Sequence, residues 1–197
     1  MARKLTKAII LEPFAQNYHQ HYYLRELARV LNTSHQSLKP HLDVLVREKV
    51  LLRTKRAAVL EYALSLGEER TLSHLVVAEK ERLFQRMEHD ELIRVLFEKL
   101  SPFFASTIFI LFGSAVQGVR KGSDIDLLIV GRRTRVAKVL RDFEEVYNRK
   151  VHSLFVTDLT KSTPVFVQEI YHKHIIFNQT ETVIRYFWQL YGKNHLV

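Results

Sequence analysis

The stretch FGSAVQGVRKGSDIDLLIV, from Phe112 to Val130, decides the fold of this chain. It places a Gly-Ser pair nine residues ahead of an Asp-Ile-Asp triplet. The apolar runs 108–112 and 127–130 flank this spacing, and their β-branched and aromatic residues predict two buried strands. The glycine-rich segment between the runs is therefore expected to join two neighbouring strands.

Two carboxylates stand at the head of the second predicted strand. Asp124 and Asp126 are two residues apart, and side chains at i and i+2 of a strand leave by the same face, whereas Ile125 points into the core. Paired carboxylates repel one another, and a hard cation such as Mg²⁺, which takes oxygen ligands together with phosphates, stabilises such a pair. The spacing thus predicts a divalent-metal site at Asp124 and Asp126.

The Gly-Ser pair is suited to holding a phosphate group. Gly113 lets the backbone approach closely, and Ser114 adds a hydroxyl beside main-chain N–H groups where a short helix is expected to begin. Four of the six glycines fall between Gly113 and Gly131, so backbone freedom is concentrated where a ligand needs it. The stretch predicts a phosphate cradle that faces the metal site.

Together these residues resemble the signature of the DNA polymerase β-like nucleotidyltransferase superfamily, in particular its small prokaryotic members. Gly118, Gly122-Ser123 and Leu127 are also in register with that signature. The resemblance implies an α+β (α/β) core, a bound nucleoside triphosphate such as ATP, and Mg²⁺-dependent transfer of a nucleoside monophosphate to a hydroxyl. We expect the acceptor to be a protein or a nucleic acid such as RNA. It assigns triphosphate binding to Gly113 and Ser114, and metal binding and catalysis to Asp124 and Asp126. Arg120, Lys121 and Ser123, in the same stretch, are further candidates for nucleotide binding.

The chain departs from the family's pattern at the third carboxylate. The family carries this acid on a later strand, but the predicted strand 151–156 contains none. His152 or Ser153 stands in its place, and Asp158 lies just beyond the strand. Two hypotheses follow: an active nucleotidyltransferase, or a transcription regulator whose transferase-like domain binds nucleotide as an effector or mediates dimerisation without catalysis.

A second departure concerns the phosphate site. The small members commonly carry an arginine where Gln117 stands in this chain. Arg120 and Lys121 follow in the same loop, and we expect them to compensate in part for the missing positive charge.

The first third of the chain has a different pattern. Apolar residues at helical spacing predict one helix within 22–31 and a second helix after a short polar turn. Thr33 or Ser34 is the expected N-cap of the second helix. Pro40 removes a hydrogen bond inside a helix, so it fits best if this helix begins near residues 37–39. Helix, short turn and helix form a helix-turn-helix pattern.

The residues after the second predicted helix complete the pattern. Strand-like runs at 50–52 and 59–64 surround the basic segment 53–56, as in a β-wing. Residues 1–66 thereby resemble winged helix-turn-helix transcription regulators, which implies double-stranded DNA as a partner. The base-edge candidates are His35, Gln36, Ser37, Lys39 and His41, and the phosphate candidates are Arg53, Lys55 and Arg56. The alternative is a winged helix used only for dimerisation or packing.

Charge is distributed unevenly along the 197 residues. The chain has 30 Lys and Arg against 21 Asp and Glu, a formal net charge of +9. Residues 1–66 hold 11 basic and 5 acidic side chains, a net of +6, whereas residues 67–197 hold 19 and 16, a net of +3. Positive charge is thus concentrated where the DNA-binding pattern lies. A basic surface that only aids solubility is the alternative explanation.

We expect three parts in the chain: a winged helix-turn-helix domain at 1–66, connecting helices at 67–100, and a nucleotidyltransferase-like domain at 101–197 that ends in a helix. The expected mixed sheet of the last part is flanked by helices. Its later elements are a helix at 136–147, a strand at 151–156, a helix at 165–172, a short strand at 175–177 and a helix at 181–191.

Other features exclude several classes of protein. The chain has no cysteine, which excludes disulfides and cysteine zinc sites. No apolar run approaches the roughly 18 residues of a membrane helix, and no secretory signal is evident, so we expect a cytoplasmic protein without a membrane partner. Helix-turn-helix proteins commonly bind as two-fold dimers, and by this analogy we expect a homodimer.

Overall fold

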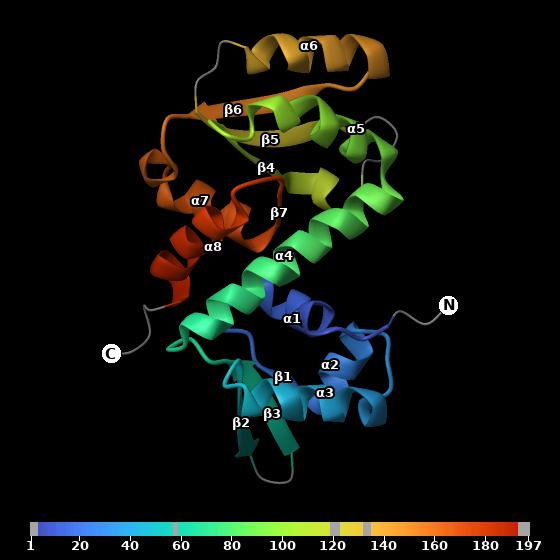
Figure 1. Cartoon of the computed structure of the whole chain (residues 1–197), viewed down its shortest axis with the longest axis vertical. Coiled ribbons are helices and arrows are strands. Elements are labelled where there is room, and N and C mark those ends of the chain that lie inside the picture. The colour runs from blue at the N-terminus through green and yellow to red at the C-terminus, as the bar shows by residue number, and fades with distance from the viewer. Residues whose placement is uncertain (1–3, 57–58, 119–122, 132–134, 193–197) are drawn as a thin grey trace. The chain divides into compact units, whose positions relative to one another are not determined.

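The computed structural model describes residues 4–56, 59–118, 123–131 and 135–192 (Figure 1). The chain divides into two compact units. The first contains Met1–Glu81 and Glu181–Val197, and the second contains Arg82–Thr180. The chain therefore leaves the first unit once and returns to it after the second unit is complete.

The first unit combines helices with a small antiparallel sheet. Its elements are α1 (Lys7–Ala15), β1 (Tyr22–Tyr23), α2 (Leu24–Val30), α3 (His35–Arg47), β2 (Leu51–Arg56), β3 (Val59–Leu64), most of α4 (Glu69–His89) and α8 (Thr180–Phe187). The strand order is β1-β3-β2. The two helices and two strands expected between residues 22 and 64 are present, and β2 and β3 pair as a hairpin.

Helix α3 begins earlier than its proline suggested. Ser34 is the N-cap, and its hydroxyl oxygen accepts a hydrogen bond from the amide of Ser37 at 3.0 Å. Pro40 lies inside the helix, so the start expected near residues 37–39 is wrong. The buried face of the helix consists of Leu38, Leu42 and Leu45, none of which is exposed. Their burial and the serine cap outweigh the one hydrogen bond that proline removes.

The C-terminal segment packs within the first unit. The rings of Tyr18 and Trp188 have centroids 5.6 Å apart, and the imidazole of His19 hydrogen-bonds to the carbonyl of Tyr191. The sequence pattern had grouped this segment with residues 101–197. The domain boundaries that we expect after residues 66 and 100 stay predictions.

The second unit contains the mixed sheet. Its elements are the end of α4, α5 (Glu91–Leu100), β4 (Ile108–Phe112), β5 (Ile125–Val130), α6 (Val136–Tyr147), β6 (Val151–Val156), α7 (Pro164–His172), β7 (His174–Ile176) and the 3-10 helices η1 (Ser101–Phe103), η2 (Gly113–Gln117) and η3 (Leu159–Lys161). The strand order is β6-β5-β4-β7, in which β5 and β6 are parallel and the other pairs are antiparallel. The expected α+β class with a mixed sheet is confirmed.

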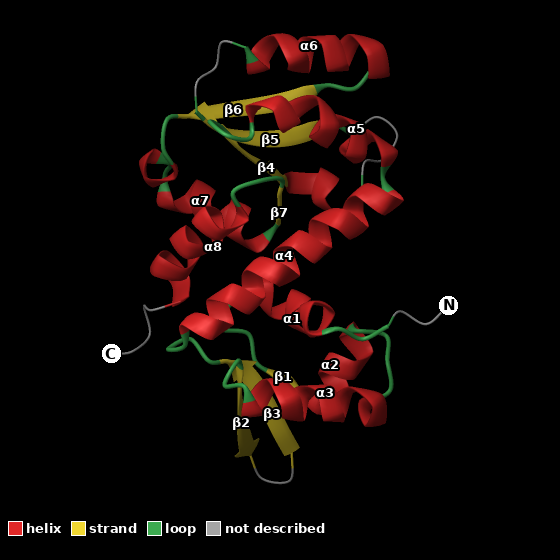
Figure 2. Cartoon of the chain, in the orientation of Figure 1, coloured by secondary structure: helices red, strands yellow, loops and turns green. Residues whose placement is uncertain are grey.

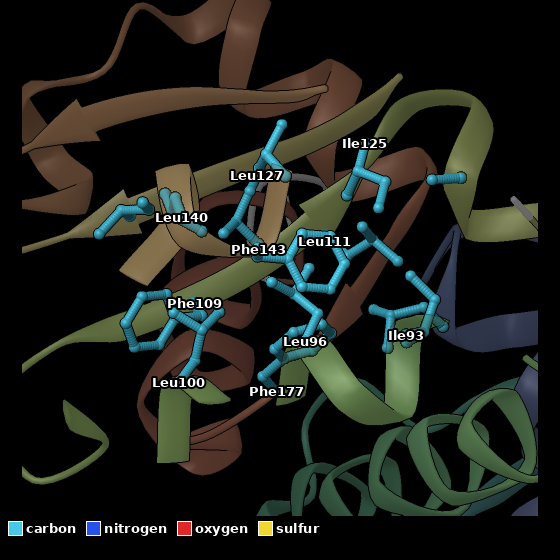
Figure 3. Close-up of a cluster of buried hydrophobic side chains, with 14 of the residues drawn as sticks. Ile93, Leu96, Leu100, Phe109, Leu111, Ile125, Leu127, Leu140, Phe143 and Phe177 are labelled. Carbon is cyan, nitrogen blue, oxygen red and sulfur yellow. The ribbon is translucent and has the colours of Figure 1, made fainter. Parts of the chain in front are cut away.

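One face of this sheet carries the main core of the unit. Figure 3 shows this cluster, to which α5, α6, β4 and β5 all contribute. Its fully buried members include Ile93, Leu96, Leu100, Phe109, Leu111, Ile125, Leu127, Ile129 and Phe143. Helix α7 lies on the other side of the sheet from α6 (Figure 2). Helices on both faces leave the ends of the strands as the accessible part of the sheet.

Most of the later elements lie where the sequence placed them. Helix α6 and strand β6 have the expected bounds, whereas α7 and β7 each begin one residue before the expected position. The expected connecting helices are α4 and α5, and Asp90 caps α5 by accepting from the amide of Ile93 at 3.3 Å. In the described part of the chain, no helix has both the length and the apolar character that a membrane crossing requires.

Candidate functional site

The burial pattern of β5 directs its acidic side chain to one face. Ile125 and Leu127 have no exposed surface, and strand alternation therefore puts Asp126 on the face opposite the core. The side chain of Asp126 is 29% exposed, and that of Asp124, which precedes the strand, is 42% exposed. Both carboxylates are accessible to a ligand from solvent.

Gly113 lies directly against Asp126. Its φ of 69° falls in the left-handed region that favours glycine. A Cβ atom at this position would overlap with Oδ2 of Asp126 and would lie 3.2 Å from its Cγ. Ser114 follows as an exposed residue of η2. The structure thus brings the expected phosphate cradle into contact with the expected metal ligands, and a side chain at residue 113 would separate them.

An arginine outside the motif is hydrogen-bonded to the segment that follows Gly113. Arg86, on α4, donates a hydrogen bond to the carbonyl of Val116, and its Nη1 would lie 3.4 Å from a Cβ atom at Gly118. Burial lowers the pKa of its guanidinium group, but arginine remains charged at neutral pH. Arg86 therefore brings a positive charge to the loop in which Gln117 supplies none. It is 30 residues from Val116 in sequence, too far for a local motif to include it.

His152 lies beside both carboxylates. The parallel register of β5 and β6 pairs it with Asp126. Its Nε2 is 3.5 Å from Oδ2 of Asp124, and its Nδ1 is 3.6 Å from Oδ1 of Asp126. These separations are longer than hydrogen bonds. Ser153 leaves by the other face of the strand, so His152 is the one of the two candidates for the vacant position that lies beside the carboxylates.

Asp158, the other candidate for that role, has a different function in the structure. It is the N-cap of η3, where Oδ1 accepts hydrogen bonds from the amide of Thr160 at 2.7 Å and from its hydroxyl at 2.8 Å. These two bonds lower the pKa of the Asp158 carboxyl below its ordinary value. The carboxylate is thus engaged in capping.

Of the other three residues expected to bind the nucleotide, the structure describes only Ser123. Arg120 and Lys121 lie outside the described residues, whereas Ser123 is described and is half-buried beside Asp124. Among the residues that the structure describes, no group of three or more His, Cys, Asp or Glu side chains could hold a metal ion. A pair of carboxylates still fits Mg²⁺, which commonly takes one or two carboxylates and completes its octahedral shell with water and substrate phosphates.

Residues 90–185 match the family model of the nucleotidyltransferase domain. The match supports the nucleotidyltransferase superfamily. The matched region begins at the cap of α5, ends within α8, and contains Gly113, Asp124 and Asp126. Neither a curated protein nor a solved structure matches the chain in the two further comparisons. Apart from Arg86, the residues of the candidate site therefore lie inside the matched region.

The residues expected to contact DNA lie outside the matched region, on α3 and β2. His35, Gln36, Ser37, Lys39, Arg53, Lys55 and Arg56 are exposed, and His41 is half-buried. The base-edge candidates thus share the N-terminal half of one helix, and the phosphate candidates share one strand of the hairpin.

Internal ion pairs occupy some of these cations. Asp43 Oδ1 lies 2.6 Å from Nη1 of Arg53, and Glu61 Oε2 lies 3.0 Å from Nε of Arg56. Lys55 makes no ion pair with any residue that the structure describes. Of the three phosphate candidates on β2, Lys55 is therefore the cation most available to a phosphate.

The contact between Gly113 and Asp126 leads to a prediction. Replacement by alanine, Gly113→Ala, forces a Cβ atom against the carboxylate and adds left-handed strain of about 1–2 kcal/mol. We expect Mg²⁺-dependent affinity for ATP, measured by calorimetry, to fall about tenfold or more.

A matched control exists at Gly67, where an added Cβ atom would meet nothing within 4 Å. The variant Gly67→Ala should keep the wild-type affinity. Wild-type affinity in Gly113→Ala would instead show that residue 113 does not border the ligand.

Proposed function

We propose that the protein transfers a nucleoside monophosphate from a nucleoside triphosphate, with ATP as the expected donor, to a hydroxyl of a protein or nucleic acid, and that it uses Mg²⁺. The contact of Gly113 with Asp126 carries the proposal, because it joins a backbone suited to phosphate with a pair of metal-binding carboxylates. The family match of residues 90–185 supports nucleotidyl transfer as the general activity.

In this reaction the acceptor hydroxyl attacks the α-phosphorus and forms a new P–O bond, while pyrophosphate leaves with the electrons of the bond that breaks. Bound Mg²⁺ would align the attack and stabilise the attacking and leaving oxygens. Asp124 and Asp126 hold the metal in this proposal. Gly113 and Ser114 offer their amides and a hydroxyl to the phosphates, and Arg86 adds positive charge beneath the loop.

The two aspartates provide the direct test. In the double variant Asp124→Asn with Asp126→Asn, side-chain shape is kept but the negative charge that binds Mg²⁺ is lost. We expect the Mg²⁺-dependent part of ATP binding, measured by calorimetry with and without the metal, to disappear.

The control removes the same charge elsewhere in the second unit. Asp142 and Glu145 are exposed residues of α6, and Asp142→Asn with Glu145→Gln should bind ATP as the wild type does. If the two double variants bind equally well, the assignment of the metal site is wrong.

A second function is favoured by one observation, the presence of His152 where a carboxylate is expected. A site with two carboxylates has less negative charge with which to hold a second metal ion. In this alternative the domain binds a nucleotide as an effector of a transcription regulator, or supports dimerisation, and performs no transfer. Pyrophosphate release by the wild-type protein, absent in the double aspartate variant, would exclude this alternative.

The variant His152→Asp places a third carboxylate next to the pair. Because it completes the acidic set of the family pattern, we expect Mg²⁺-dependent pyrophosphate release to rise by about tenfold or more, the usual size of effects at residues that tune a metal site. The variant His152→Asn removes the imidazole without adding charge and should give no such rise. An equal rate in both variants would mean that residue 152 is not the third position.

We further propose that residues 1–66 bind double-stranded DNA as a winged helix, in a cytoplasmic homodimer. The exposed N-terminal half of α3 has the geometry of a recognition helix, and the β2–β3 hairpin presents basic side chains as a wing does. The net charge of +6 in this part of the chain favours association with phosphates.

The hairpin is tested by the double variant Lys55→Ala with Arg56→Ala. Removing two phosphate contacts should weaken binding to a random-sequence duplex. It should also reduce the slope of log K against log salt by about 1 to 2. The lower value applies if Arg56 stays paired with Glu61 when DNA is bound. Fluorescence anisotropy over a salt series measures this slope.

Two exposed cations on α6 give the control. The variant Lys138→Ala with Arg141→Ala removes the same charge and should leave the slope unchanged. An unaltered slope in the hairpin variant would take the wing out of the DNA interface.

A further inference from the structure

An aromatic ring borders the acidic pair on the sheet. Phe112 on β4 is the antiparallel partner of Asp126, and directly opposed residues share a face with Cβ atoms about 4.5–5.5 Å apart. His152 is the partner of Asp126 on its other side. Imidazole, carboxylate and phenyl ring therefore stand in one row across three strands, at the end of the sheet where Gly113 begins η2.

A second ring from α7 extends this row. Phe166 packs against Phe112 with ring centroids 5.4 Å apart and planes at 88°. Both rings are only half-buried. The neighbouring Val165 is 79% exposed, the highest value among the exposed large apolar residues. Part of each ring is thus left accessible after α7 packs on the sheet.

Several contacts fix this pair of rings relative to the sheet. The amide of Phe166 donates to the hydroxyl oxygen of Thr163 at 3.4 Å, in the N-cap of α7. At the other end of the helix, Nδ1 of the buried His174 lies 2.9 Å from the carbonyl of Ile170. His174 is itself paired with Phe112 across β4 and β7. Helix α7 is therefore held at both ends, so the two rings are preorganised.

We propose that Phe112 and Phe166 form the subsite for the nucleobase of the bound triphosphate. The inference rests on the proposed function, in which the phosphates bind at Gly113 and Ser114, next to the metal-binding aspartates. A base is joined to the phosphates through one ribose, so the base belongs on a surface that adjoins the metal site, and this aromatic pair adjoins it. Half-exposed rings stack on any base, and purines offer the larger π surface. The ligand class is a purine nucleoside triphosphate.

The test compares two ligands that share the phosphates but differ in the base. Affinities of ATP and of inorganic tripolyphosphate are measured with Mg²⁺ for the wild type and for Phe166→Leu, which keeps an apolar side chain but removes the π face. We expect the preference for ATP over tripolyphosphate to fall about tenfold, because stacking contributes to ATP binding alone. Affinity for tripolyphosphate should stay at the wild-type value.

Two further variants distinguish the loss of the aromatic face from a disturbance of α7 by the leucine. Phe166→Trp retains an aromatic face and should retain the preference for ATP. The control Gln168→Ala changes an exposed residue of the same helix and should alter neither affinity. An unchanged preference in Phe166→Leu, or an equal loss for both ligands, would overturn the subsite. If the wild type binds neither ATP nor tripolyphosphate with Mg²⁺, the proposed function itself fails, and the subsite fails with it.

Discussion

The candidate site depends on the register of β5 between its two neighbours. Ile125 and Leu127 are fully buried on one face, and their burial keeps Asp126 on the other face between Phe112 and His152. A slip of one residue would exchange the faces and would bury the carboxylate. Because β4 and β6 flank β5, the site combines Phe112 and Asp126 from within the motif with His152 from a later segment. The hydrophobic core thus specifies the position of the polar groups.

The two units handle their charges in opposite ways. In the second unit, Asp124 and Asp126 both lie beside His152 and are accessible, and a bound cation would reduce the repulsion between the two carboxylates. In the first unit, by contrast, Asp43 pairs with Arg53 at 2.6 Å and with Lys39 at 3.7 Å. The protein therefore already supplies counterions to part of its basic surface, and a polyanion has to compete with them.

Local patterns were sufficient for most of the site but not for its neighbours in space. The Asp pair, Gly113 and the bounds of α6 and β6 follow from spacing and alternation, which act within a few residues. Choosing His152 over Ser153 requires knowing which face of β6 lies beside Asp126. Identifying Arg86 requires the hydrogen bond that joins α4 to the loop in the folded protein. Pro40 favoured a later start of α3 than the structure has. The buried leucines and the Ser34 cap outweigh the cost of a proline inside the helix.

The return of the chain to its first unit has a consequence for biosynthesis. Trp188, which packs against Tyr18, is synthesised only after all of Arg82–Thr180. During synthesis, the hydrophobic surface of the N-terminal segment therefore stays incomplete while the second unit emerges from the ribosome and can fold as a unit. The first unit therefore starts to be synthesised first but is completed last. Truncation near the C-terminal end should lower the stability of the first unit before that of the second.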